Sequence, residues 1–94
     1  MDVGQIRVVM FQDGETWVGQ CLEYDIGAQA STVEELHARL LLVVELDRKE
    51  SLQKHGVEFK GIEPAPKHFH DMWEKRAGEF TPKNDGPFEM ALVA

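Results

Sequence analysis

The segment WVGQCLEYDIGAQASTVEEL, residues 17–36, decides the fold because it joins two strand-like runs to the start of a helix. Residues 15–22 are rich in β-prone side chains, and the run at 26–30 is compatible with a short third strand. Between them lies an acidic corner, CLEYDIG, at residues 21–27. We therefore expect a strand, a corner, a strand and a helix, in this order.

The carboxylates of this corner raise the question of catalysis. Metal-dependent nucleases hold two metal ions with several carboxylates on adjacent strands, which here would require Asp13 and Glu15 to join Glu23 and Asp25. All four occupy expected turns, where acidic side chains are commonly solvated. We therefore expect Glu23 and Asp25 to face water, and the apolar side chains beside them to point inward.

A capping box marks the start of the helix. Thr32 is followed three residues later by Glu35, and Ser31 with Glu34 offers the same signature one residue earlier. In this motif the hydroxyl accepts a hydrogen bond from the backbone N–H three residues on. The serine and the threonine are thereby explained without any nucleophilic role.

The predicted helix runs from about 33 to 54 and stops before Gly56, the residue type favoured just past a helix end. One sector of its helical wheel is apolar and should face the sheet: Val33, Leu36, Leu40, Val43 and Val44. Leu42 and Leu46 lie nearly opposite this sector. They either pack under the C-terminal segment of the same chain or form an interface with a second subunit or partner.

Upstream of the opening segment, Asp13-Gly14 separates the run at 5–12 from the run at 15–22. An Asp-Gly pair between β-prone runs predicts a hairpin, because glycine tolerates the positive φ of a tight turn. Neither face of these strands is wholly polar. One face should be covered by the long helix and the other by something else, for which a second subunit is a candidate.

Downstream, Pro66 suits the first position of a short helix at about 66–77. Residues 81–87 read as a loop, and 87–93 as a closing C-terminal strand. We expect one α+β domain at residues 1–94, with a core at 5–55 and an extension at 56–94. The residues predicted for a self- or partner-interface are Leu42, Leu46, Phe69 and Trp73.

The amino-acid composition limits the kinds of partner and the compartment that we expect for this protein. The formal charge is −7, from 10 basic and 17 acidic residues, which argues against direct nucleic-acid binding and fits a basic partner. The single cysteine, Cys21, favours a reducing compartment. With no signal-like N-terminal run and no apolar run that could span a membrane, we expect a cytoplasmic protein.

No site with metal, cofactor or nucleophile chemistry is predicted. His68 and His70 are two residues apart and would diverge on a helix, whereas helical zinc sites use histidines four apart. Cys21 has no CxxC partner and lies among apolar neighbours, so we expect a packed thiol. We accordingly expect a protein without catalytic activity, cofactor or metal.

The opening segment, preceded by a strand and an Asp-Gly turn, resembles the N-terminal domain of the HicB family of antitoxins over about residues 5–55. The resemblance lies in a strand ending in cysteine, an acidic-apolar corner, a short strand bearing glutamine and a capped T-x-E-E helix. Leu22 stands where the family often has proline. The matching residues are Trp17, Cys21, Glu23, Asp25, Ile26, Gln29, Thr32, Glu34 and Glu35.

This resemblance implies a partial ribonuclease H-like fold, in which a helix packs across a three-stranded meander and a further strand follows. It also implies a non-catalytic domain that forms dimers or higher oligomers and neutralises a small basic RNA-cleaving toxin. The family's DNA-binding module has no counterpart in residues 56–94, where no helix is rich in Arg or Lys. The alternatives are a self-associating domain without a toxin, and a degenerate metal-dependent nuclease.

Overall fold

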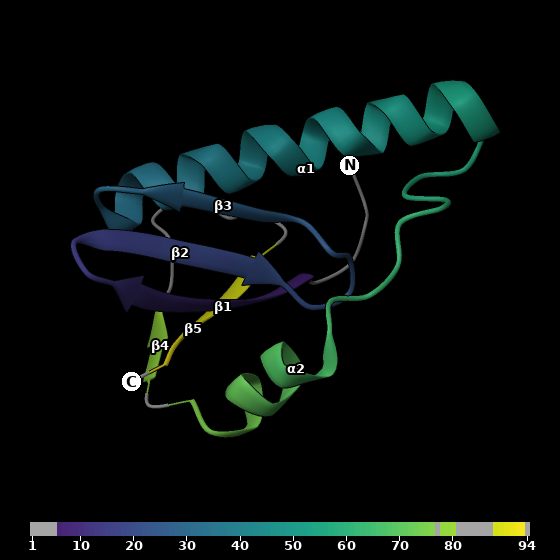
Figure 1. The fold of residues 1–94 in the computed structure, drawn as a ribbon. Helices are drawn as coiled ribbons and strands as arrows, with labels where there is room; N and C mark the ends of the chain where they lie inside the picture. Colours follow the sequence, from purple (N-terminus) through teal and green to yellow (C-terminus); the bar gives the residue numbers. More distant parts are fainter. Residues whose placement is uncertain (1–5, 77, 81–87, 94) are drawn as a thin grey trace.

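The computed structural model describes residues 6–76, 78–80 and 88–93, which form a mixed α+β fold. A sheet lies between a long helix and a short one, with α1 across one face and α2 against the other (Figure 1). In chain order the elements are β1 (Ile6–Asp13), β2 (Thr16–Cys21), β3 (Gly27–Ala30), α1 (Val33–His55), α2 (Lys67–Glu74), β4 (Gly78–Phe80) and β5 (Phe88–Leu92).

The sheet has the strand order β3-β2-β1-β5-β4. The first three strands form the predicted antiparallel meander, with Val8 opposite Cys21 and Gly19 opposite Ala28. The predicted hairpin turn is confirmed, because Gly14 adopts a φ of 66° between β1 and β2. The C-terminal strand β5 then pairs in parallel with β1 inside the same chain, which places β1 in the middle of the sheet.

The helix α1 begins and ends as its sequence signals predict. Thr32 is the N-cap residue, and its hydroxyl accepts a hydrogen bond from the backbone N–H of Glu35. Gly56 closes the helix in the left-handed conformation, and its N–H donates to the carbonyl of Leu52. Figure 1 shows the C-terminal half of α1 extending beyond the strands.

The inner face of α1 carries the predicted apolar stripe. Leu36, Leu40 and Val44 are buried against the α1 side of the sheet. The helix approaches the sheet closely at Gly19, where an added Cβ would lie 3.0 Å from Cδ1 of Leu40. The remaining members of the stripe, Val33 and Val43, are partly buried at its margin.

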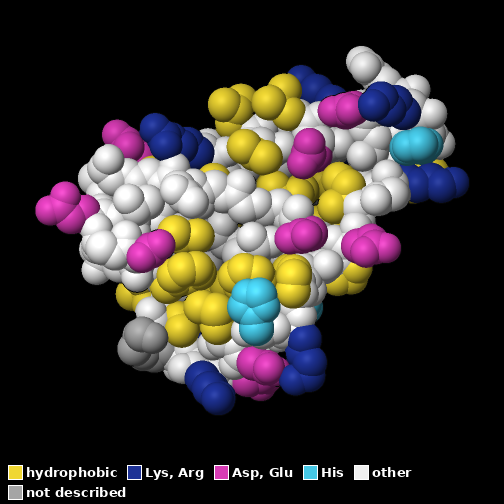
Figure 2. All heavy atoms as spheres, in the orientation of Figure 1, with side chains coloured by type: hydrophobic (Ala, Val, Ile, Leu, Met, Phe, Trp, Pro, Cys, Tyr) yellow, Lys and Arg dark blue, Asp and Glu magenta, His cyan; other side chains and the backbone are white. Residues whose placement is uncertain are grey.

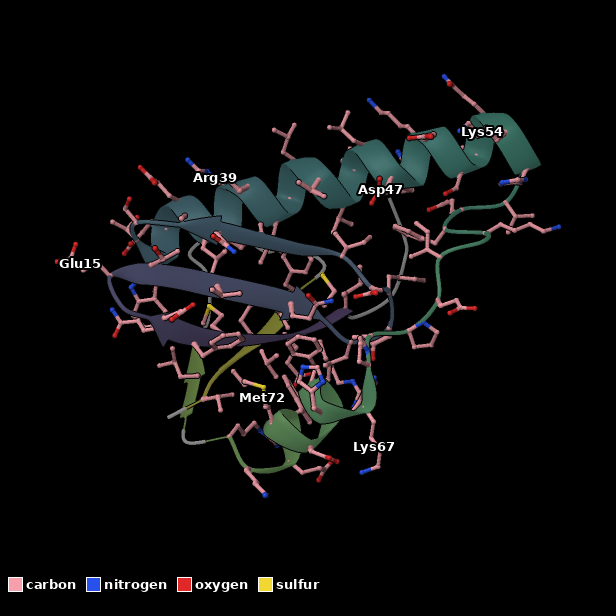
Figure 3. All side chains as sticks on the ribbon, viewed as in Figure 1. Glu15, Arg39, Asp47, Lys54, Lys67 and Met72 are labelled. Carbon is pink, nitrogen blue, oxygen red and sulfur yellow. The ribbon has the colours of Figure 1, made fainter. Side chains whose placement is uncertain are left out.

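The opposite face of the sheet is covered by α2 of the same chain rather than by the second subunit that the strand pattern suggested. Trp73 packs there with Val9, Leu22 and Ala91. Met72 points from α2 toward the sheet (Figure 3).

The helix α2 ends at Glu74, three residues before the predicted end at 77. The backbone that follows forms β4, a three-residue strand paired with β5 that was not predicted. The predicted loop at 81–87 lies outside the described residues.

The β3 edge of the sheet is partly closed by a side chain from α1. Nη1 of Arg39 donates a hydrogen bond to the backbone carbonyl of Gln29 at 2.6 Å. Edge carbonyls of this kind can otherwise pair with a strand from another molecule. The short length of β3 and this arginine both make strand addition at that edge unfavourable.

Candidate functional site

The acidic corner is a structural clamp: Asp25 is exposed, as expected, Glu23 is only partly exposed, and both carboxylates are bonded within the chain. Glu23 accepts two hydrogen bonds from Arg7, at 2.7 Å from the backbone N–H and 2.6 Å from Nε. Asp25, although exposed, accepts a hydrogen bond from Nε2 of Gln20 at 2.9 Å. Both carboxylates therefore hold β1 and β2 in place and are already bonded within the chain.

The same corner fastens the segment between the two helices. The N–H of Asp25 donates to the carbonyl of Glu63 at 2.7 Å, and the N–H of Ala65 donates to the carbonyl of Leu22 at 3.0 Å. The ring of Tyr24 stacks on Phe59 with centroids 4.1 Å apart. As expected, the apolar side chains of the corner point inward, and here they anchor residues 56–66.

Replacing Glu23 with glutamine tests the clamp. The Arg7–Glu23 ion pair is partly exposed, with side chains 38% and 31% accessible. We therefore expect the free energy of unfolding to fall by about 0.5–1 kcal/mol, and the loss to shrink at high salt. Urea denaturation of Glu23→Gln measures this loss of unfolding free energy, and the exposed-turn variant Glu15→Gln is the control. An equal effect of the two substitutions would contradict the clamp.

The structure does not bring the acidic residues together for metal binding. Asp13 and Glu15 lie at one end of β2 and the corner residues at the other, about 20 Å away for a six-residue strand. Glu15 marks the hairpin end in Figure 3. Among the residues that the structure describes, no group of three or more His, Cys, Asp or Glu side chains could hold a metal ion.

The histidines of α2 have local partners. Nε2 of His70 lies 3.2 Å from the carbonyl oxygen of Ala65, at hydrogen-bond distance. The ring of His68 packs on Phe69 at 3.9 Å between centroids. Both histidines thus have contacts within or beside their own helix, in agreement with the predicted surface role.

The thiol of Cys21 is packed in the core, as its apolar neighbours predict. Burial, assisted by the negative charge of Glu23, raises the pKa of Cys21 to about 12. The thiolate is the nucleophilic form, so this thiol is unreactive at neutral pH. Cys21 therefore serves as a small apolar side chain on the α1 side of the sheet.

His37 is a titratable group that sequence analysis did not single out. Its Nε2 is shielded from solvent and has no hydrogen-bond partner among the described residues, and its ring meets Phe88 edge-on at 5.9 Å. Burial lowers the pKa of His37 because the imidazolium loses solvation. The helical wheel could have located it, since His37 is adjacent to the buried Leu36 at the edge of the inner stripe.

This lowered pKa predicts a pH dependence of stability. The unfolded chain binds the proton more tightly than the folded chain, so stability is fully present above the ordinary histidine pKa near 6.5. It should fall as the pH drops below that value through the lowered pKa of the folded state. Wild type and His68→Gln should both show this loss of stability below about pH 6.5 in thermal unfolding, whereas His37→Gln should not. Parallel pH profiles for wild type and His37→Gln would contradict the assignment.

A polar cleft of about 310 Å³ lies between the C-terminal half of α1 and the segment after it. Its lining combines both signs of charge, with Asp47 and Lys54 of α1 on one side (Figure 3) and Lys60 on the other. Ser51, also in the lining, donates its hydroxyl to the carbonyl of Asp47 at 2.8 Å. The carboxylates of the lining outnumber its lysines, and the hydroxyl of Ser51 is bonded to a backbone carbonyl rather than to a base.

The four residues predicted for an interface do not share one surface. Leu42 and Leu46 are 61% and 58% exposed on the outer face of α1, so the alternative that they pack under the C-terminal segment is wrong for the described residues. Trp73 is only 6% exposed and Phe69 is half-buried, both on the far side of the sheet. The outer face of α1 therefore carries exposed apolar side chains (Figure 2).

Comparisons of the chain with models of protein families, with curated proteins and with solved structures find no match. No helix within the described residues is long and apolar enough to cross a membrane.

Proposed function

We propose that this chain is a non-catalytic protein-interaction domain of the HicB antitoxin type, which binds and masks a small basic RNA-cleaving protein. The observation that carries the proposal is the order of the elements. A three-stranded meander is followed by a long helix and a strand that returns parallel to β1. The meander, the helix across it and a further strand are the elements that the resemblance implies, and their presence supports the proposal beyond the short motif; the parallel pairing of that strand with β1 is an additional feature.

The charge of the chain supports a basic partner. The formal charge is −7, which favours rapid encounter with a basic protein and disfavours nucleic acid. The corner carboxylates are bonded to Arg7 and Gln20, and Cys21 is buried with its pKa raised to about 12. These groups hold the scaffold, which supports a binding role rather than chemistry at the corner.

The test is neutralisation of a defined partner. The partner to test is any small basic protein that proves to be encoded beside the gene of this chain, expressed in the native host with and without the chain. We expect growth to be arrested by the basic protein alone and restored by co-expression. Purified together, the two proteins should bind with an affinity that falls as salt rises, because opposite charges are screened. Absence of both rescue and binding would refute the antitoxin role.

A second candidate is a self-associating domain with a structural or regulatory role and no toxin partner. The exposed Leu42 and Leu46 favour it, because they form an apolar surface that no described segment of the chain covers. This candidate predicts a stable oligomer without any rescue of growth. The growth assay therefore separates the two functions even if both proteins form oligomers.

A further inference from the structure

The imidazole of His37 differs from the other histidines of the chain. Of its two ring nitrogens, only Nε2 is both shielded from solvent and without a hydrogen-bond partner among the described residues. By contrast, His55 and His68 are exposed, and Nε2 of His70 lies at hydrogen-bond distance from a backbone carbonyl. The face in Figure 2 shows histidines over α2 and the C-terminal end of α1, and none over the N-terminal half of α1, where His37 lies.

Phe88, the first residue of β5, packs against this imidazole. The two rings meet edge-on with their centroids 5.9 Å apart, and Phe88 is buried. Phe88 is paired with Ile6, and this is the first pair of the parallel ladder between β5 and β1. The contact with His37 therefore lies at the end of a strand ladder, where local opening costs less free energy than in its middle.

The described elements around His37 offer no charge that would stabilise an imidazolium there. The strands β2 and β3 carry no charged side chain. Arg7 and Glu89 are paired in register and occupy the other face of the sheet, where the guanidinium of Arg7 lies over the ring of Trp73. On α1, Glu34 lies one turn before His37, but it is exposed and no ion pair joins these two described residues.

We propose that the contact between His37 and Phe88 is a pH-dependent switch, which holds the start of β5 in the sheet when the imidazole is neutral and releases it when the imidazole is protonated. The neutral ring can carry its one proton on Nδ1 and leave Nε2 as a bare acceptor. The imidazolium carries a proton on both nitrogens, so a charged donor would occupy a shielded position without an acceptor. Opening the start of β5 gives water access to that donor. The switch belongs to the fold itself and is independent of the proposed binding partner.

The start of β5 is the part that we expect to move. The helix α1 is held against the sheet by the fully buried Leu36 and Leu40, on either side of His37 in the sequence. At the other end of β5, the N–H of Val93 donates to a carbonyl of β1 at 2.9 Å. Protonation should therefore open the strand locally at Phe88 and leave the meander, α1 and the end of β5 in place.

The direction of the pH dependence follows from the burial of His37. Burial lowers the pKa of His37 in the closed state from its ordinary value near 6.5, whereas the solvated ring of the open state has the ordinary pKa. The open state thus binds the proton more tightly. The closed state is fully favoured above about pH 6.5, and it loses this advantage as the pH falls through the lowered pKa.

Amide hydrogen exchange measured by NMR locates the opening. Between about pH 6.5 and 5, the protection of residues 88–90 in the wild type, corrected for the intrinsic exchange rate, should fall by about fivefold or more. The protection of β2 and of Val93 should fall by less. His37→Gln should lose this pH dependence at residues 88–90, and the exposed-histidine control His68→Gln should keep it. An equal loss in β2 and at residues 88–90 would indicate global unfolding, and no loss at 88–90 would indicate that the imidazole turns outward alone; either result would overturn the switch.

An NMR titration of His37 tests the part played by Phe88. Coupling between two sites is reciprocal, so a change that loosens Phe88 must raise the pKa of His37. Phe88→Leu keeps an apolar side chain but removes the ring, and it should shift the pKa of His37 upward toward 6.5. The matched control is Val93→Ala, at the other end of β5, which should leave the pKa of His37 unchanged. Circular dichroism at neutral pH checks that both variants fold. A pKa of His37 in Phe88→Leu equal to that of the wild type would overturn the assignment of the switch to this contact.

Discussion

Replacing Trp73 with alanine is expected to lower the free energy of unfolding by about 3–5 kcal/mol, the usual cost of removing a buried aromatic side chain. Trp73 is 6% exposed and joins α2 to the second face of the sheet. The guanidinium groups of Arg7 and Arg76 lie over its ring, at 5.7 and 4.7 Å from the centroid. The substitution therefore removes both apolar burial and two cation–π contacts. Urea denaturation measures the change.

Two further variants sharpen this experiment. Glu74→Ala alters the exposed neighbour on the same helix and should change the free energy of unfolding by less than about 0.5 kcal/mol. Trp73→Phe keeps an aromatic ring and should lower the free energy of unfolding by less than Trp73→Ala does. Limited proteolysis of Trp73→Ala should cut first between residues 64 and 76, because α2 loses its main anchor. A loss in Trp73→Ala no greater than that in Glu74→Ala would show that α2 contributes little to stability.

Replacing Leu40 with alanine is expected to lower the free energy of unfolding by about 2–5 kcal/mol, because its side chain is fully buried between α1 and the sheet. For a domain of this size the melting temperature should fall by roughly 10 °C or more. Leu52→Ala, at an exposed leucine of the same helix, should have only a small effect. Thermal unfolding by circular dichroism compares the two. Similar losses in both variants would contradict the observed orientation of α1.

The packing of Leu40 on Gly19 also predicts that their substitutions are not additive. In the wild type, Gly19→Ala introduces a Cβ at 3.0 Å from Cδ1 of Leu40 and should be destabilising. In the Leu40→Ala background the same methyl group enters the space that the leucine has left. The double variant should therefore lose less stability than the sum of the single variants. Additive losses would mean that the two positions do not share this space.

Local signals predicted the elements with specific end chemistry. The Asp-Gly turn fixed the first hairpin because Gly14 supplies a positive φ. Thr32 and Gly56 located both ends of α1, since one is a side-chain cap and the other a left-handed stop. Periodicity alone identified the buried stripe of α1 and placed Leu42 on the opposite side. Each of these features depends on residues that are close together in the chain.

The features that sequence analysis missed depend on residues far apart in the chain. Arg7 and Glu23 are sixteen positions apart, and no local pattern indicates that they pair. The cover that α2 provides for the second sheet face comes from Trp73, whose apolar pattern fits an interface with a partner equally well. The strand at 78–80 has only three residues, so it shows no alternation that could be recognised.

The position of β5 has a consequence for how the protein is made. It pairs with the central strand β1, although about eighty residues separate the two in the chain. One edge of β1, with Val8, Val9 and Met10, therefore has no strand beside it until residues 88–92 have been synthesised. Contacts this distant in sequence form slowly, and the unpaired apolar edge is open to association meanwhile. Completion of the sheet is thus a late event, and the growing chain is most prone to aggregation just before it.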